Sequence, residues 1–213
     1  MTRESSVHRL AKILLLVLGI GCLFLYGYLF WSGRITLRPG AAASSSTSTQ
    51  EPVDLWDAYE QAHAAAREEA EDAELLSAST QQQAASEETL MSGVGNWTFV
   101  FYTPAGKSVL DVIVDSESAR VVNQTRIWNK PEVLTEGAWR KGPRDALLVF
   151  LAQGGRKFLE EHLQAVVSLH LDSGDNGEPI WDIAALKMGE RSPFAARINA
   201  ETQEVLSITS ADE

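Results

Sequence analysis

The sequence predicts an α+β fold in which an N-terminal transmembrane helix precedes two related modules, each a helix packed on an antiparallel sheet of three to four strands. Three observations support this prediction: an uncharged apolar run at residues 13–31, helical periodicity followed by strand alternation, and the return of that pattern 84 residues later. The predicted parts are a cytoplasmic tail (1–12), the transmembrane helix (13–31), a flexible linker (32–52), the first module (53–127), a connector (128–142), the second module (143–209) and a short tail (210–213).

The apolar run is long enough to cross a membrane. A helix of this length covers a hydrocarbon core of about 30 Å at about 1.5 Å per residue, and it satisfies its own backbone polar groups. Arg3, Arg9 and Lys12 precede the run, with only Glu4 opposing them. This bias predicts a single-pass protein of the cell membrane, with a cytoplasmic N-terminus and a C-terminal domain on the extracytoplasmic, periplasmic side.

Two processing signals compete with a retained anchor. Gly19-Ile20-Gly21-Cys22 resembles a lipoprotein box, but residues 23–31 after it stay apolar. Three alanines at 41–43 resemble a signal-peptidase site, although they lie about ten residues beyond the apolar run. We favour an uncleaved anchor, in which Gly19, Gly21 and Cys22 pack against helices of a partner protein.

The chain beyond Arg38 is strongly acidic. Five of the 18 Lys and Arg residues and one of the 29 Asp and Glu residues lie at or before Arg38, which leaves a net charge of −15 for the remainder. Such a surface repels phosphate backbones, so the composition argues against nucleic acid as a partner. Cys22 is the only cysteine, which excludes disulfides and a Cys-ligated zinc from the outer part.

The first module begins with an amphipathic helix. Small and apolar residues recur there at spacings of three and four, namely Leu55, Tyr59, Ala62, Ala66, Ala70 and Ala73. A strand at 74–80 and a polar loop through Gly95 follow the helix. Alternation then predicts strands at 97–101, 110–114 and 120–127, the first of them led by Trp97.

The second module repeats this order. Pro143 suits a helix N-terminus, and Gly154-Gly155 interrupts the helix that follows. Strands are expected at 167–171 and 180–187. Aligning Trp97 with Trp181 matches 25 residues without a gap, and the alternating apolar positions of the two segments coincide. Each sheet would have one apolar face for its own helix to cover.

This helix-and-strands unit resembles the PepSY family, whose last hairpin carries a similar turn. The turns here are Asp115-Ser-Glu-Ser-Ala-Arg-Val and Asn199-Ala-Glu-Thr-Gln-Glu-Val, with Ala119 and Gln203 where the family has glycine. The resemblance covers most of residues 53–209 in two copies. It implies a small extracytoplasmic module that binds or inhibits peptidases or mediates assembly, and it implies no catalytic residues.

Several short motifs favour ordinary structure over chemistry. Residues 105–108 mimic the end of a phosphate loop, but Phe101 stands where the first glycine is required, so a hairpin turn is expected. Residues 172–177 lack EF-hand ligands, which indicates a solvated turn and leaves weak calcium binding open. His162 and His170 form no metal motif, and His170 lies on the polar phase of its strand.

The remaining candidates lead to the same view. Carboxylates such as Asp111, Asp115 and Asp182 are expected on the solvated surface, whereas Trp97 and Trp181 are expected to anchor the core rather than to stack on a ligand. No Gly-x-Ser-x-Gly motif is present, and the only cysteine lies in the apolar run. We therefore expect no enzymatic activity, no cofactor and no metal.

One basic cluster is distinctive against the acidic background and is the expected docking surface: Arg140, Lys141, Arg144, Arg156 and Lys157. The expected function is that of a membrane-anchored binding or assembly protein. It would serve as an accessory subunit of a larger membrane complex, for example in respiratory or photosynthetic electron transfer. Its expected partners are the lipid bilayer and other membrane or extracytoplasmic proteins. The alternative is a PepSY-type regulator or inhibitor of an extracytoplasmic peptidase.

Overall fold

The computed structural model describes residues 53–83, 85–93, 95–135, 137–139, 141–174, 177–187, 189 and 192–210. The predicted span and linker, with Gly19, Gly21 and Cys22, lie outside these residues, as does Arg140. Within the described ranges, no helix combines the length and the apolar character needed to cross a membrane.

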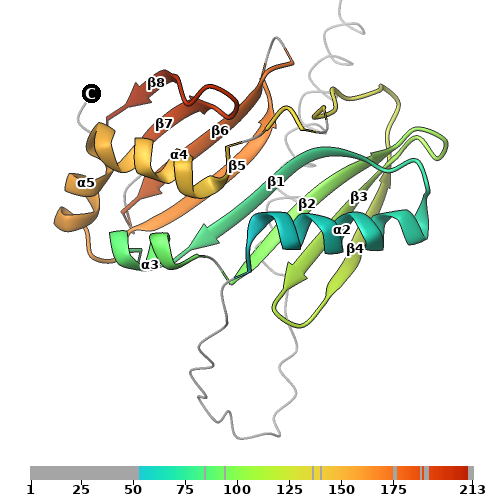
Figure 1. Ribbon diagram of the computed structural model, residues 1–213, viewed down its shortest axis with the longest axis horizontal. Helices are drawn as coiled ribbons and strands as arrows, with labels where there is room; N and C mark the ends of the chain where they lie inside the picture. The colour runs from blue at the N-terminus through green and yellow to red at the C-terminus, as the bar shows by residue number, and fades with distance from the viewer. Residues whose placement is uncertain are drawn as a thin grey trace, which may run out of the picture. The chain divides into compact units, whose positions relative to one another are not determined.

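The prediction of two separate modules, each with its own sheet, is wrong. The described residues are predominantly β, and their strands form a single eight-stranded antiparallel sheet (Figure 1). In spatial order the strands are β4 (Ala119–Arg126), β3 (Ser108–Asp115), β2 (Asn96–Thr103), β1 (Glu74–Gln82), β5 (Val166–Ser173), β6 (Pro179–Leu186), β7 (Phe194–Asn199) and β8 (Val205–Thr209).

The reason for this correction is the pairing of β1 with β5. Each predicted sheet would have left one of these strands at an edge, with a row of unpaired backbone N–H and C=O groups. Five residue pairs join the two strands instead, from Ala78 with Leu171 to Gln82 with Val167. The ladder satisfies both edges at once, and it makes one body from the two units that the sequence predicts.

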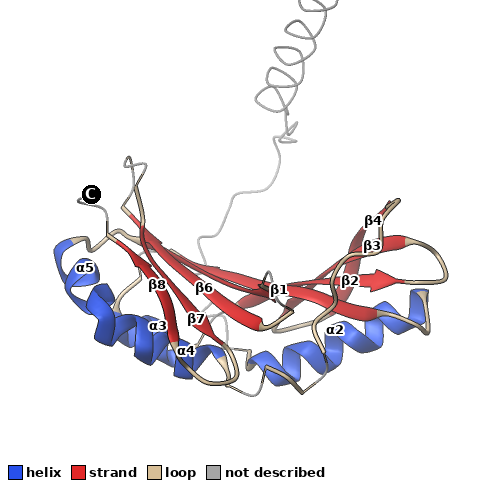
Figure 2. Ribbon diagram, turned by 90° about the horizontal axis from the view of Figure 1, so that it is seen from above, coloured by secondary structure: helices blue, strands red, loops and turns tan. Residues whose placement is uncertain are grey.

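The helices lie on one side of this sheet. The sheet is curved, and its convex side carries α2 (Leu55–Glu69), α3 (Glu87–Ser92), α4 (Pro143–Phe150) and α5 (Arg156–Glu161) (Figure 2). The core lies between the helices and the sheet, where the alternating apolar side chains of the strands are buried. In α2 the buried residues are Leu55, Ala58, Ala62 and Ala66, and the three small alanine side chains let the helix lie close to the sheet.

Local chemistry explains how the helices begin and where they bend. Asp54 caps α2 by accepting a hydrogen bond from the backbone N–H of Trp56 (2.8 Å). The predicted interruption at Gly154-Gly155 is confirmed, because the segment Leu151–Gly155 between α4 and α5 is kinked and Gly154 has a φ of 121°. A side chain at Gly155 would collide with the ring of Phe150.

Two elements differ from the sequence-based expectation. The polar loop predicted before Gly95 contains α3, whose first turn is closed by a capping box between Ser86 and Thr89. The first helix ends at Glu69, so Ala70 and Ala73 lie beyond it. Ala73 is nevertheless buried, which explains why its spacing mimicked a longer helical face.

The two halves of the sheet correspond in detail at the aligned tryptophans. Both side chains are buried, and each indole N–H donates to the backbone carbonyl two residues before the helix of its own half. Trp97 donates to Val53 (3.3 Å), and Trp181 donates to Lys141 (3.1 Å). The two rings also meet edge to face, with centroids 6.5 Å apart. Each of these tryptophans therefore links the sheet to the start of a helix, and the contact between their rings connects the two halves.

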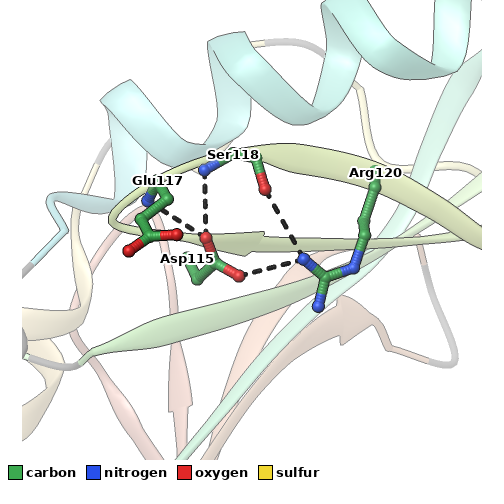
Figure 3. A network of polar contacts seen from close by, with 4 residues as sticks. All are labelled: Asp115, Glu117, Ser118 and Arg120. Carbon is green, nitrogen blue, oxygen red and sulfur yellow. Dashed lines mark hydrogen bonds and ion pairs between the residues drawn. The ribbon is translucent and has the colours of Figure 1, made fainter.

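The turns that follow the third strand of each half also correspond. Asp115 Oδ1 accepts hydrogen bonds from the backbone N–H groups of Glu117 and Ser118, each at 3.0 Å (Figure 3). Asn199 Oδ1 accepts the equivalent pair in the other half, each at 2.9 Å. These are Asx turns, in which a side-chain oxygen replaces a backbone acceptor. Asp115 additionally binds Arg120 at 3.1 Å.

The second turn contains backbone strain that glycine would remove. Gln203 has a φ of 66°, and within the described residues both polar atoms of its side chain are buried without a hydrogen-bond partner. Because a non-glycine residue in this region costs about 1 kcal/mol or more, Gln203→Gly should raise the free energy of unfolding by about 1 kcal/mol. Urea denaturation followed by circular dichroism measures the change.

The matched control is Ala119→Gly, at the aligned position of the other turn. Ala119 begins β4 and is not among the residues with positive φ. Glycine there should lower the free energy of unfolding by about 0.5–1 kcal/mol, because it adds entropy to the unfolded chain. Equal changes in both variants would contradict the assignment of strain to Gln203.

The charge of Asp115 should add a pH dependence that its counterpart Asn199 lacks. The backbone N–H groups of Glu117 and Ser118, together with Arg120, lower the pKa of Asp115 below its ordinary 3.8. The carboxylate therefore stabilises the fold above that ordinary value, and the contribution is lost as the pH falls through the lowered pKa. Between about pH 6 and pH 3, wild type should lose more stability than Asp115→Asn in urea titrations. Identical pH slopes would show that this carboxylate does not stabilise the turn.

Candidate functional site

No described helix covers the concave face of the sheet (Figure 2). Because strand side chains alternate, every second residue points to this face. At its centre these residues are mostly polar: Ser77, Ser79 and Gln81 on β1, Thr98 on β2, Ser168, His170 and Asp172 on β5, Asp182 on β6 and Arg197 on β7. We call this surface the open face.

The middle of the open face lies on a local two-fold axis. Ala78 pairs with Phe99 on the neighbouring strand, and Leu169 pairs with Ile183 in the same way. Phe99 and Ile183 are separated by the 84-residue offset of the repeat. Ala78 and Leu169 are therefore equivalent. The residues after them are Ser79 and His170, and these two face each other in the β1–β5 ladder. The axis thus passes between a hydroxyl and an imidazole side chain.

One row of side chains crosses all eight strands through this centre. Strand pairing links, in order, Arg120, Ile113, Thr98, Ser79, His170, Asp182, Arg197 and Ser207. The first half of the row is neutral near the axis, whereas the second half is charged. The symmetry of the backbone is therefore broken by the chemistry of the side chains.

The charged half contains one ion pair and one contact between a histidine and a carboxylate. Arg197 Nε donates to Asp182 Oδ1 at 2.9 Å, and His170 Nε2 lies 3.4 Å from Asp172 Oδ2. All four side chains are partly exposed, with relative accessibilities between 36% and 47%. Exposed pairs of this kind contribute little to stability, but they fix the positions of the polar groups that a partner would contact.

Asp172 is the least satisfied member of this group. Among the described residues its Oδ1 atom is buried without a hydrogen-bond partner. Burial raises the pKa of Asp172, His170 opposes that shift, and the neighbouring Asp182 adds to it. The buried charge of Asp172 is therefore only partly compensated by the neighbouring residues that the structure describes.

A shallow hollow lies beside the axis. It has a volume of about 560 Å³ and is lined mainly by hydroxyl and amide side chains of β1, β2 and β5, with His170 at its border. Those lining residues include Ser79, Gln81, Gln83, Asn96, Thr98 and Ser168. Polar lining of this kind suits hydrogen bonding with a protein surface better than it suits an apolar ligand.

The predicted basic cluster is elsewhere, in and before the helices of the second half. The guanidinium of Arg156 donates two hydrogen bonds to the carboxylate of Glu87 in α3, at 2.6 and 2.8 Å. This bidentate contact raises the pKa of Arg156 and lowers that of Glu87. Lys157 lies 3.8 Å from Glu161. Arg144 is exposed, and the main chain of Lys141 bonds with Ala200 and Trp181. Arg156 therefore ties two helices together.

The sequence indicated the open face only in part. Alternation correctly predicted that His170 and Asp182 point away from the apolar core, and both were interpreted as solvated surface. It did not indicate that Asp172 and Arg197 would join them, because those contacts depend on the β5–β6–β7 register. In the part of the chain that the structure describes, no group of three His, Cys, Asp or Glu side chains is arranged to hold a metal ion.

Removing the charge of Asp172 should stabilise the fold. Because burial raises the pKa of Asp172 above its ordinary 3.8, the folded protein retains a proton at pH values at which the unfolded chain has already released it. The free energy of unfolding therefore falls as the pH rises from the ordinary pKa through the raised pKa. Asp172→Asn should abolish that decline and be more stable than wild type at neutral pH in urea titrations. The control is Asp111→Asn, since Asn123 already donates to this carboxylate (2.9 Å). A less stable Asp172→Asn would contradict the expectation.

Comparison with known proteins finds no family model that matches the sequence, and no curated protein matches it. Among solved structures, the fold is similar to a crystal structure described as a "putative lipoprotein" from Clostridium difficile 630. The similarity has a TM-score of 0.49 and 12% sequence identity, and it covers 76% of this chain and 95% of the other. At this level of similarity, the function of the chain has to be inferred from its own residues.

Proposed function

We propose that this chain is a non-enzymatic binding or assembly protein, held at the membrane by residues 13–31, which docks on another protein through the open face. The partner would be an extracytoplasmic or membrane protein, and the chain would serve as an accessory subunit of the complex. The observation that carries this proposal is the open face itself, a broad polar sheet surface that no described helix covers.

The polarity of the open face supports docking rather than permanent burial. Hydroxyl and amide side chains at its centre keep the face compatible with water when the partner is absent. The same groups offer donors and acceptors at many points of a curved surface. Protein interfaces of the reversible kind have this polar character, with about one hydrogen bond per 100–200 Å².

The acidic charge of the chain indicates which kind of partner surface would bind to the open face. The chain carries a net charge of −11, and the carboxylates of Asp172 and Asp182 lie on the open face, each with 36% relative accessibility. A partner segment with Lys, Arg or backbone N–H groups would donate to these carboxylates and would be steered towards the acidic chain. We therefore propose a basic, donor-rich loop as the part of the partner that meets the β5–β6 region.

A second candidate is a PepSY-type regulator, for which the partner is an extracytoplasmic peptidase. One observation favours it: Gln203 has a φ of 66° at the turn position where the family carries glycine. The backbone there adopts the conformation that glycine favours, although the residue differs. This candidate uses the same open face and differs only in the identity of the partner.

The test is recovery of the partner from native membranes. The full chain, purified in mild detergent after brief chemical cross-linking, should bring down a specific protein that mass spectrometry identifies. Ser79→Arg and Thr98→Arg place bulky cations at the centre of the open face, and each should lower recovery of the partner about tenfold. Circular dichroism and thermal melting check that the variants are folded.

Matched controls change the helix side instead. Arg144→Glu and Lys157→Glu alter the charge of the predicted basic cluster and should leave recovery unchanged. Loss of the partner in these two variants, with full recovery in Ser79→Arg, would move the docking surface to the cluster and overturn the proposal. Recovery of the free chain alone would also overturn it. Inhibition of a recovered peptidase by the purified chain would select the second candidate.

A further inference from the structure

Aromatic residues lie along one side of α2: Trp56 is exposed, whereas the rings of Tyr59 and His63 also pack against the ring of Phe101 in the sheet. Leu55, Ala58, Ala62 and Ala66 face the sheet. A second row lies one or two residues after these along the helix: Trp56, Tyr59, Glu60, His63 and Arg67. Together with Gly137 and Trp139 of the connector, this row lines a hollow of about 610 Å³. We call it the aromatic hollow.

The aromatic hollow is held open by ring stacking. The rings of Trp56 and Trp139 are nearly parallel, at 10°, with centroids 4.4 Å apart. Tyr59 meets Trp139 edge to face at 5.2 Å, and the rings of Tyr59 and His63 stack at 5.4 Å. Trp139 is 1% exposed, whereas Trp56 remains 40% exposed. A buried ring therefore supports a second ring that is open to a ligand.

Two charged side chains belong to this row. Glu60 and Arg67 are exposed and seven residues apart on α2, which separates them by about 10 Å along the helix axis. Within the described residues, neither forms an ion pair with another side chain. The Nε1 atom of Trp139 is buried there without a hydrogen-bond partner. The aromatic hollow thus combines π faces with the exposed carboxylate of Glu60 and the exposed guanidinium of Arg67.

We infer that the aromatic hollow binds a neutral sugar, as part of an oligosaccharide. The C–H face of a pyranose ring carries slight positive charge and packs against the negative face of an indole, which is the surface that Trp56 offers. A carboxylate accepts hydrogen bonds from sugar hydroxyls, and a guanidinium donates to their oxygens. Glu60 and Arg67 therefore suit the two roles that one hydroxylated ligand requires.

Other ligand classes fit this set of residues less well. An organic cation would suit the aromatic faces, but Arg67 stands at the rim and repels it. An anion would bind Arg67 but would meet Glu60 and a chain with a net charge of −11. A purely apolar ligand would strip water from both charged groups without replacing their hydrogen bonds. A neutral polyhydroxylated ring avoids all three costs.

The experiment is a titration of the full chain with three probes: maltotriose, cellotriose and the trisaccharide of N-acetylglucosamine. The detergent must have a polyoxyethylene headgroup, because alkyl maltosides would themselves occupy a sugar site. Calorimetry and tryptophan fluorescence should report saturable binding of at least one probe, with a dissociation constant between about 10 μM and several millimolar.

Variants locate the binding. Trp56→Ala should weaken it at least about tenfold, and Glu60→Gln and Arg67→Gln should each weaken it about three- to tenfold. Trp128→Ala is the matched control, because this ring is 98% exposed outside the aromatic hollow. Glu68→Gln changes an exposed carboxylate of α2 that does not line the aromatic hollow. Both controls should bind as wild type does.

The outcomes separate the sugar site from simple packing of the connector. If none of the three probes binds saturably, or if binding survives Trp56→Ala within about twofold, the inference is overturned. Equal weakening by Trp128→Ala would overturn it as well. Should Trp56→Ala fail to fold by circular dichroism, Glu60→Gln and Arg67→Gln decide the matter, since both side chains are exposed.

Discussion

The antiparallel ladder between β1 and β5 is the interaction on which the rest of this structure depends. It joins two four-stranded halves that each expose one edge strand, and it satisfies those edges with backbone hydrogen bonds. It also sets the distance and direction between the halves, so that Trp97 and Trp181 meet in one core. Without this ladder there would be two small sheets, each with its own helix and neither with a broad uncovered surface.

Continuity of the sheet has a functional consequence. All described helices lie on the convex side, where the strands bury their alternating apolar side chains, and the centre of the concave side remains polar. The two-fold axis brings Ser79 against His170, which places the divergent residues of the halves side by side. Duplication thus provides the size of the surface, and divergence of single side chains provides its chemistry.

The helices of the two halves also differ in how they use their polar and aromatic side chains. In the second half, the cation Arg156 is used internally, to hold α5 to Glu87 of α3. In the first half, α2 packs Leu55 and three alanines against the sheet, and the neighbouring side of the helix carries Trp56, Glu60 and Arg67. The proposed protein-docking face and the proposed sugar site therefore lie on opposite sides of the sheet and involve no common residue.

Several elements were predictable because their signals are local. Alternation at positions 110, 112 and 114, Pro143 at a helix start and the Gly154-Gly155 kink depend on neighbouring residues alone. The short α3 was missed because six polar and apolar residues carry too little periodicity, and its start is signalled only by the capping pair Ser86 and Thr89. Trp139 was missed because its partner, Trp56, is distant in sequence.

The amino-acid sequence by itself determined where most strands and helices lie, which residues enter the core, that the two segments led by Trp97 and Trp181 share a pattern, and how acidic the chain is. Only the tertiary structure decided that β1 and β5 pair, that all the described helices share one side, and that Asp172, His170, Asp182 and Arg197 gather on the other. The physical reason is that periodicity reports which face of an element is apolar. Pairing between distant edges leaves no periodic trace, because the same alternating strand can lie at an edge or at the centre of a sheet.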